Sequence, residues 1–511
     1  MNSSQPELGY FSLMPVQCGH LSTELNSDFT LPDYKCEMRR LLSVKAYIVP
    51  PSEYQSGGSA QLDGDINYKI LYLGADGELY SLDLNDKYSF KLPLNFNPHS
   101  VNPDEITFIT QVKDESISAR VTGPRKISLK SRLTLHSLCL SPELYTANLV
   151  GSHNRSSIEN LVLNTPVANI KKCASELQII NDFISLDGAA DNARVIDCQA
   201  STAISECVSS NGLMNVRGEL IFKVLYCDDT QSVLPLCSIR KVPFSTAIAC
   251  DEVNNSYECS CYAVITDTKS EVKENGISLE AAFTLYATAQ KNENASYVSD
   301  AYSTEKEAEI SHLNVSLLQA LKASIGNLTQ NEAYSLEDLS IPADSKIIDV
   351  CANATIDDFC AENLRLIIKG KCDYQVIYHF DGEYSCKEVR APFKYELSYK
   401  LAQENCENYK WWAHATPSFS KVRSDGQKLF IDCELFFNIL AFTENSIMVL
   451  NEMIFGQARE SRSGELLLCY PEQKSKLWTV AKQYGKPVSA IKKRNSLPEN
   501  ETEIKRRFLI I

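Results

Sequence analysis

Three stretches of the chain share one pattern of alternating apolar and polar residues. Gly64–Tyr72 reads GDINYKILY, Gly218–Tyr226 reads GELIFKVLY and Gly370–Tyr378 reads GKCDYQVIY. Alternation with a period of two, rich in Ile, Val, Tyr and Phe, is typical of a strand with one buried face. The second copy begins 154 residues after the first, and the third begins 152 residues after the second. The pattern therefore predicts one strand in three copies.

The similarity extends to the residues that precede each strand. Three further apolar runs, RLLSVKA, RVIDCQA and KIIDVCA, end at Ala46, Ala200 and Ala352, each 26 positions before the last tyrosine of its copy. Equal spacing without a gap indicates a repeat. Because a period near 150 residues is far longer than that of solenoid repeats, we expect whole duplicated domains. The expected boundaries are 1–150, 151–300 and 301–450.

Turn signals predict how each domain continues. Asp76-Gly77-Glu78 and Asp381-Gly382-Glu383 directly follow the first and third copies, and Asp-Gly between alternating apolar runs is a strong hairpin signal. A different or longer turn is expected in the second copy. Each domain should therefore be an antiparallel β sandwich or barrel, which the pattern does not distinguish. Between the domains, apolar residues at helical spacing in 156–173 and 311–328 predict short helices.

The C-terminal segment 466–511 has a helical pattern instead. A first helix is expected to begin after a Ser475 cap and to end at Gly485, and a second to run from Pro487 to Asn495. Short strands at 466–470 and 508–511 would complete a small β-α-α-β module. The apolar face of the first helix consists of Leu477, Val480, Ala481 and Tyr484.

The charge of this module differs from that of the rest of the chain. It holds ten Lys or Arg and four Glu, a net charge of +6, whereas the whole chain of 511 residues has a net charge of −15. A basic module on an acidic body predicts a module with a partner of its own. The alternative is a solvated surface bias without function.

Composition and motifs exclude several classes of function. With 44% hydrophobic and 23% charged residues the chain is typical of a soluble globular protein, and no run of about 18 apolar residues predicts a membrane span. The first residues lack the pattern of a secretory signal. No nucleophile elbow, phosphate-binding loop or zinc motif is present, so we expect no enzyme, no cofactor, no metal and no nucleic-acid partner.

The cysteines and tryptophans allow further expectations. The 18 cysteines are scattered without a C-x-x-C pair, which predicts free, mostly buried thiols in a reducing cytoplasm. The pair Trp411-Trp412 either forms an aromatic platform for a ligand or belongs to a sheet core, and the core is the simpler interpretation.

Residues 476–497, KLWTVAKQYGKPVSAIKKRNSL, resemble a LysM module. That resemblance implies binding of N-acetylglucosamine polymers such as peptidoglycan, in a groove between the loop after the first strand and the loop before the last. In both loops this sequence departs from the family, because cations stand where small residues are usual. Long cations favour an acidic protein partner instead. Trp478 is either half-buried packing or an edge of the groove. The predicted partner- or glycan-binding residues are Gln473, Lys474, Ser475, Lys476, Trp478, Asn495, Leu497, Lys505, Arg506 and Arg507.

The repeated unit, clearest in residues 29–84, resembles the SPOCS domain, a spore-coat-associated domain of spore-forming Firmicutes. Three such domains followed by one LysM module resemble the layout of spore-coat morphogenesis proteins. The resemblance implies a non-catalytic scaffold in the mother-cell cytoplasm, at the forespore surface. It would dock an acidic coat protein, with a coat-basement ATPase as the expected partner, through the LysM-like module. The alternative is a protein that binds peptidoglycan through that module.

Overall fold

The computed structural model describes residues 9–56, 58–94, 106–151, 154–186, 193–228, 232–401, 408–418, 420–459, 467–472, 475–504 and 508–511. These residues form mainly antiparallel strands, with two short α-helices near the C-terminus. The predicted mainly β class with a small helical module at its end is therefore confirmed. No helix in the described ranges is long and apolar enough to cross a membrane.

The first of three similar modules combines two sheets. The motif sheet, which contains the repeated motif, has the order β2-β4-β3, with β5 also paired to β4. The long sheet, named for its longer strands, has the order β1-β7-β6. The strands are β1 (Gly9–Thr30), β2 (Met38–Ile48), β3 (Ser52–Ser56), β4 (Ser59–Gly74), β5 (Leu79–Pro93), β6 (Thr107–Gly123) and β7 (Lys126–Thr146).

The second module repeats this plan after β8 (Asn148–Val150) and a short 3-10 turn at Arg155–Ser157. Its motif sheet has the order β11-β12-β13, and its long sheet has the order β10-β15-β14, with β9 also paired to β15. The strands are β9 (Ile158–Ala174), β10 (Gln178–Ser185), β11 (Ala193–Ser210), β12 (Leu213–Asp228), β13 (Ser232–Ala249), β14 (Glu258–Lys273) and β15 (Gly276–Ser303).

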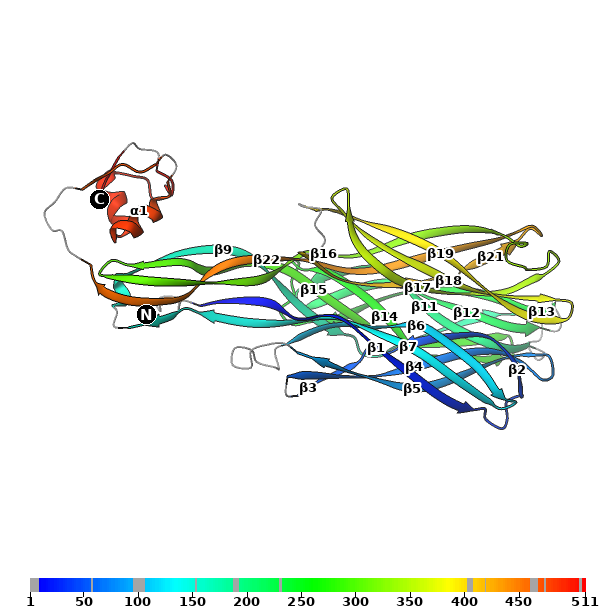
Figure 1. Cartoon of the computed structure of the whole chain (residues 1–511). Coiled ribbons are helices and arrows are strands. Elements are labelled where there is room, and N and C mark those ends of the chain that lie inside the picture. The colour runs from blue at the N-terminus through cyan, green and yellow to red at the C-terminus, as the bar shows by residue number, and fades with distance from the viewer. Residues whose placement is uncertain are drawn as a thin grey trace.

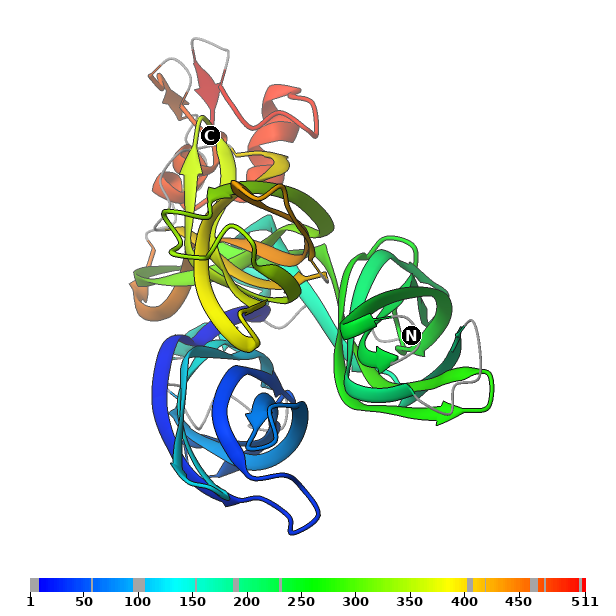
Figure 2. The ribbon, with the colours of Figure 1, turned by 90° about the vertical axis from the view of Figure 1, so that its right-hand side faces the viewer.

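The third module has a β17-β18-β19 motif sheet and a β16-β22-β20 long sheet, with β21 also paired to β22. In each module both sheets enclose one apolar core, and the first two modules have ring-like outlines when seen end-on (Figure 2). Each module therefore consists of two separate sheets around a common core. The strands are β16 (Lys306–Ser335), β17 (Lys346–Glu362), β18 (Arg365–Phe380), β19 (Glu383–Lys400), β20 (Tyr409–Pro417), β21 (Lys421–Ser424) and β22 (Lys428–Ala458).

The repeated tyrosines occupy equivalent places in the three motif sheets. Each lies on the central strand of its motif sheet, opposite the same position of the first strand of that sheet, which is β2, β11 or β17 and is called the first motif strand. The pairs are Tyr72 with Leu41, Tyr226 with Val195 and Tyr378 with Ile347. The sequence repeat is therefore also a structural repeat.

A β-bulge recurs at the same position in the first strand of each motif sheet. It lies between Leu41 and Ser43, between Val195 and Asp197, and between Ile347 and Asp349. A bulge redirects a side chain that the strand would otherwise turn to the opposite face. The bulged residues belong to one buried cluster between the modules, which we call the axial cluster: Leu42, Ile196 and Ile348 with Leu71, Leu225 and Ile377.

The Asp-Gly turns also join modules. The hairpin prediction is confirmed, since Gly77, Asp381 and Gly382 have φ values of 87°, 49° and 77°. The glutamate after each turn binds an arginine of another module. Arg194 Nη2 lies 2.8 Å from Glu78, and Arg39 Nη2 lies 2.8 Å from Glu383.

Beyond the modules the long strands continue as a stalk (Figure 1). It consists of the paired ends of β9 and β15 and of β16 and β22, together with β8, which pairs with β22 in parallel. The C-terminal module lies at the far end of this stalk (Figure 1). The stalk has its own small apolar core of Val167, Tyr297, Val315, Leu317 and Val449.

The predicted helices at 156–173 and 311–328 are wrong, because both stretches are strands, β9 and β16. On β16, Leu317 packs in the stalk core while its neighbour Leu318 packs in another buried cluster. A register shift between Ala320 and Lys322 further changes the phase of the pattern. A strand covered on both faces loses its alternation, so its apolar spacing can imitate a helix.

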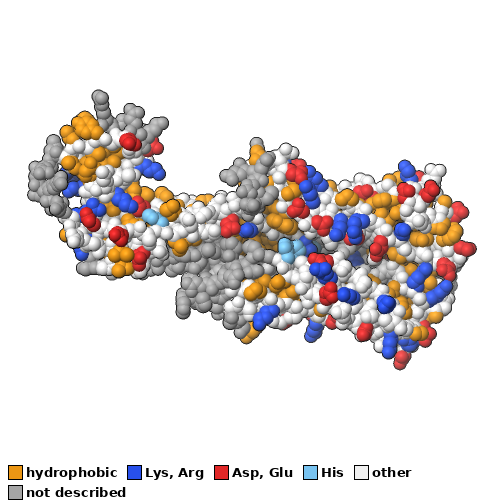
Figure 3. Space-filling view, in the orientation of Figure 1, with side chains coloured by type: hydrophobic (Ala, Val, Ile, Leu, Met, Phe, Trp, Pro, Cys, Tyr) orange, Lys and Arg blue, Asp and Glu red, His pale blue; other side chains and the backbone are white. Residues whose placement is uncertain are grey.

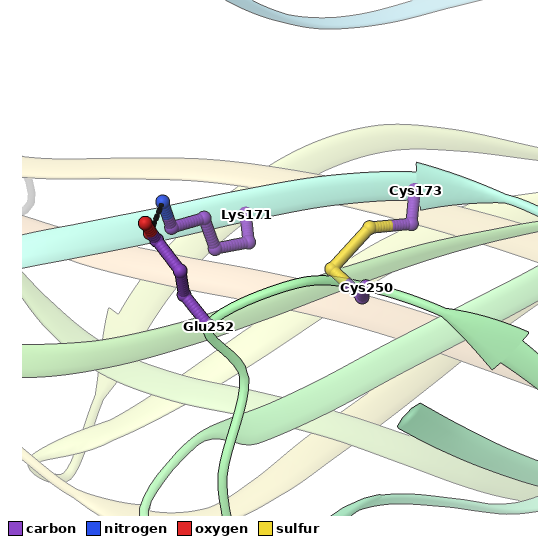
Figure 4. Close-up of a disulfide and its surroundings, with 4 residues drawn as sticks. All are labelled: Lys171, Cys173, Cys250 and Glu252. Carbon is purple, nitrogen blue, oxygen red and sulfur yellow. Dashed lines mark hydrogen bonds and ion pairs between the residues drawn. A yellow bond between two sulfur atoms is a disulfide. The ribbon is translucent and has the colours of Figure 1, made fainter. Parts of the chain in front are cut away.

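One pair of cysteines is bonded, which corrects the expectation of free thiols. Cys173 at the end of β9 and Cys250 after β13 form a disulfide across 77 residues (Figure 4). Lys171 and Glu252 form an ion pair of 2.5 Å beside it (Figure 4). Spacing in the sequence could not reveal this bond, because only the fold brings the two strands together.

Candidate functional site

The candidate site is the C-terminal module, which begins with β23 (Leu468–Cys469) and α1 (Leu477–Tyr484). The predicted apolar face of α1 is buried, with Leu477, Val480 and Ala481 at most 5% exposed. Gly485 ends the helix in the left-handed region at φ 59°, as predicted. The helix therefore packs on the module core in the expected orientation.

The predicted cap of α1 is wrong. The residue at the N-cap is Lys476, which makes no side-chain cap hydrogen bond. Ser475 instead donates its hydroxyl to the carbonyl oxygen of Glu472 at 2.7 Å. Ser475 therefore stabilises the loop between β23 and α1, and the free N–H groups of the first turn of α1 receive no side-chain cap.

The second helix, α2 (Val488–Asn495), ends where the sequence predicts, and β24 (Leu509–Ile510) pairs with β23. Asn495 is 6% exposed. Its Nδ2 donates to the carbonyl oxygens of Ile510 at 2.7 Å and Ile491 at 2.9 Å, and its Oδ1 accepts from the N–H of Ile510 at 2.8 Å. The Asn495 amide thus joins α2 to the closing strand.

Trp478 holds the module to the stalk. Its indole Nε1 donates to Asp300 Oδ2 at 2.8 Å, and Lys482 Nζ lies 2.6 Å from Asp300 Oδ1. Both side chains stand on one face of α1, and Asp300 belongs to β15 of the second module. His312 Nε2 lies 3.8 Å from the same carboxylate. One acidic side chain therefore binds the aromatic and the basic group together.

Tyr302 completes this contact. Its side chain is 1% exposed and packs in the apolar core of the C-terminal module. The ring meets Trp478 edge-on at 4.9 Å between centroids, and the hydroxyl donates to the carbonyl oxygen of Lys486 at 2.8 Å. Burial raises the pKa of Tyr302, which keeps the hydroxyl protonated as a donor. A stalk residue is therefore part of the module core.

The structure separates the predicted site residues into three groups. Lys476 is exposed and pairs through its backbone with Glu503, while Leu497 is partly buried against the module core. Trp478, Asn495 and Ser475 have the contacts given above, with the stalk, with the closing strand and within the loop before α1. The remaining five lie outside the described residues: Gln473, Lys474, Lys505, Arg506 and Arg507.

Two features of the module escaped the sequence analysis. Asp300 and Tyr302 have no local signal, because they precede Trp478 by more than 170 residues in an ordinary strand. Two aromatic side chains beside the small sheet are also exposed, Tyr470 by 70% and Phe508 by 48%, and their rings lie 6.2 Å apart. An exposed aromatic pair is a common element of binding surfaces.

The three β modules show fewer features of a binding site than the C-terminal module does. Basic and acidic side chains alternate over the face seen in Figure 3, without a large area of one sign. Trp412 is 7% exposed and belongs to a buried cluster, and Trp411 stacks on Phe359 at 4.7 Å, so the core interpretation of this pair is confirmed. In the described part of the chain, no three His, Cys, Asp or Glu side chains could hold a metal ion together.

These features define a protein of three two-sheet β modules that carries a small helical module on a stalk. Residues 191–273, in the second module, match the family model described as "SipL, SPOCS domain". The matched region includes the second copy of the repeated motif, so this part of the chain is similar to that domain. No curated protein and no solved structure matches the chain.

Proposed function

We propose that the protein is a non-catalytic scaffold of the spore envelope, which binds an acidic protein partner through its LysM-like C-terminal module. The SPOCS match at 191–273 supports a role in sporulation. The observation that carries the proposal is the attachment of the module. Its Trp478 face is bound to Asp300, so a partner would bind the module through another part of its surface.

The charge of the module favours a protein partner over a glycan. Lys476, Lys493 and Arg494 are exposed, and the segment from 466 has a net charge of +6. Glycan binding in this type of module needs a close approach to the backbone, whereas clustered cations attract an acidic surface over several ångströms. A partner in the mother cell with an acidic docking face, such as a coat-basement ATPase, fits this charge.

The proposal is tested with the full chain and its Lys505→Glu, Arg506→Glu, Arg507→Glu triple variant. Wild-type protein should capture one acidic protein from a lysate of sporulating cells, and salt near 0.5 M should release it, because the Debye length then falls to a few ångströms, about 4 Å. The triple variant should lose the capture. Full binding by the variant would contradict the proposal.

A control variant separates local charge from net charge. Lys87, Lys91 and Lys126 are exposed on the first module, and replacing all three with Glu gives the same change in net charge. This control should capture the partner as the wild type does. In a separate experiment, the wild type and the triple variant are sedimented with isolated peptidoglycan sacculi. Salt-resistant sedimentation of wild type and triple variant alike would favour the glycan-binding alternative instead.

A further inference from the structure

A cavity of about 160 Å³ lies between the three modules, at the place where their repeated motifs meet. One water molecule needs roughly 10–15 Å³ by the same measure, so the cavity is large enough for several waters or a small ligand. The first motif strand of every module reaches its wall, including the repeated alanines Ala46, Ala200 and Ala352. These small side chains leave the space open.

The three modules contribute residues at equivalent positions to the wall of the cavity, but these residues differ in charge. On the third strand of each long sheet, strand pairing places Lys113, Val264 and Thr416 at one position, opposite Thr134, Thr284 and Phe436. The next position holds Asp114, Ile265 and Pro417. All six line the cavity. Only the first module has charged residues at these two positions. The modules can therefore pack together without a charge there.

Several polar groups on this wall lack a hydrogen-bond partner among the described residues. The Nζ of Lys113 is buried and makes no hydrogen bond to the described residues. The same holds for the Tyr47 and Ser201 hydroxyls, which stand at equivalent positions of modules 1 and 2, and for the Thr355 hydroxyl of module 3. A buried donor without a partner is destabilising, and more so when it is charged. The cavity thus contains an unusual concentration of unused donors.

The charged groups around Lys113 favour an anion in this space. Lys45 also lines the cavity, and burial lowers the pKa of Lys113 to about 8, which leaves it mainly a cation at neutral pH. The one carboxylate on the wall is Asp114, whose Oδ2 accepts from Asn353 Nδ2 at 3.1 Å. His414 is on the same wall, and burial lowers its pKa to about 4, so it is neutral at pH 7. Burial lowers the pKa of Lys45 as well. Lys113 and three hydroxyls thus share this wall with one carboxylate.

We propose that this cavity binds a small oxyanion of about the size of inorganic phosphate, held by Lys113 together with the hydroxyls of Tyr47, Ser201 and Thr355. Lysine is a common phosphate ligand because its ammonium acts as a point charge with three donors. Each module contributes at least one donor, so the anion joins all three. Asn353 and Asp114 remain partly accessible, which leaves an entrance for an ion from solution.

The test is calorimetric titration of the full chain with inorganic phosphate at constant ionic strength, with thermal unfolding as a second measurement. Wild-type protein should show one saturable site and a midpoint temperature that rises with phosphate. Lys113→Thr introduces the residue that module 3 has at the same position, so it should fold. Its affinity should fall about tenfold to hundredfold, the expected effect of a lost charged hydrogen bond. Lys113→Met, which keeps most of the side-chain volume, should behave in the same way.

The control is Lys126→Thr, which makes the same charge change on the exposed surface of the first module. It should bind phosphate as the wild type does. Binding that is equally strong in Lys113→Thr, or that never saturates up to about 10 mM phosphate, would overturn the proposal. Equal losses in Lys113→Thr and Lys126→Thr would also overturn it, since they would reveal a general charge effect.

Discussion

The three interfaces between modules are built on the same positions but differ in charge. Between modules 1 and 2, Lys69 Nζ lies 3.6 Å from Asp197, and between modules 2 and 3, Lys223 Nζ lies 2.7 Å from Asp349. Between modules 3 and 1 the equivalent residues are Gln375 and Ser43, which carry no charge. Because all three interfaces form in one molecule, the ion pair is not required for docking.

The difference has a physical basis. A buried ion pair loses about as much hydration energy as its attraction returns, so a neutral pair can replace it at little cost. What a buried pair cannot tolerate is the loss of one partner. Burial is the largest single influence and lowers the pKa of Lys223, but the Asp349 carboxylate and the neighbouring Cys351 and Cys237 together raise it more, so the net pKa is raised. The pairs therefore add little stability beyond that of a neutral pair as long as both partners are present.

The largest effect should come from the second interface. Lys223 and Asp349 have side chains only 2% and 5% exposed. Lys223→Met would leave the Asp349 carboxylate buried without its cation, at a cost of about 3–5 kcal/mol. The free energy of unfolding from urea titrations measures this.

The control for that variant places the neutral residues of the third interface, Gln and Ser, at the second interface. Lys223→Gln combined with Asp349→Ser should restore most of the lost stability, because no unpaired charge remains. A single variant as stable as the wild type would show that Asp349 has another compensating partner.

The same comparison explains what the sequence could predict. The repeat, the Asp-Gly hairpins, the helices of the C-terminal module and its Gly485 follow from local patterns, which reflect local backbone preferences. The interfaces do not, because Lys69 and Lys223 look like ordinary exposed residues of an alternating strand. Only the bulges and the meeting of three modules bury them. Asp300 was unpredictable for the same reason, since its partners come from a distant segment.

Two histidines extend the comparison to pH. His136 and His414 line the junction of the long sheets, and module 2 has tyrosines at both equivalent positions. Burial lowers the pKa of His136 to about 3 and that of His414 to about 4. Below pH 6.5 the unfolded chain therefore binds more protons than the folded protein. Stability should fall by about 2–3 kcal/mol from pH 6.5 to pH 4 through each of these two groups.

The variant pair His136→Asn and His414→Gln isolates that effect, since Asn438 and Gln111 stand at the equivalent positions of other modules. Burial raises the pKa of Asp114 to about 6, which gives a slope of opposite sign between its unfolded value and pH 6. The Asp114 contribution is the same in the wild type and in the histidine double variant, so it cancels when their unfolding free energies are subtracted. If the unfolding free energies of the wild type and the double variant decreased equally as the pH falls, the assignment to the histidines would be contradicted.

A smaller loss is expected at the first interface. Lys69 is 9% exposed, but Asp197 there also accepts a hydrogen bond from Gln199 Nε2 at 2.7 Å. After Lys69→Met the carboxylate keeps this donor and borders an open groove between the modules. The cost should be about 1–2 kcal/mol, below that of Lys223→Met, in the same urea titration. A larger loss than for Lys223→Met would reverse the ranking based on burial.

The smallest effect is expected where an ion pair is added to the third interface. Ser43→Asp together with Gln375→Lys places the charged pair at positions that are neutral in this protein, and Ser43 is 8% exposed. The attraction should only offset the loss of hydration, so the double variant should lie within about 1 kcal/mol of wild type. Ser43→Asp alone buries a carboxylate without its lysine and should be less stable than the double variant. A double-mutant cycle measures the difference as a coupling energy. Zero coupling would mean that these two positions do not meet, and that the third interface is not equivalent to the other two.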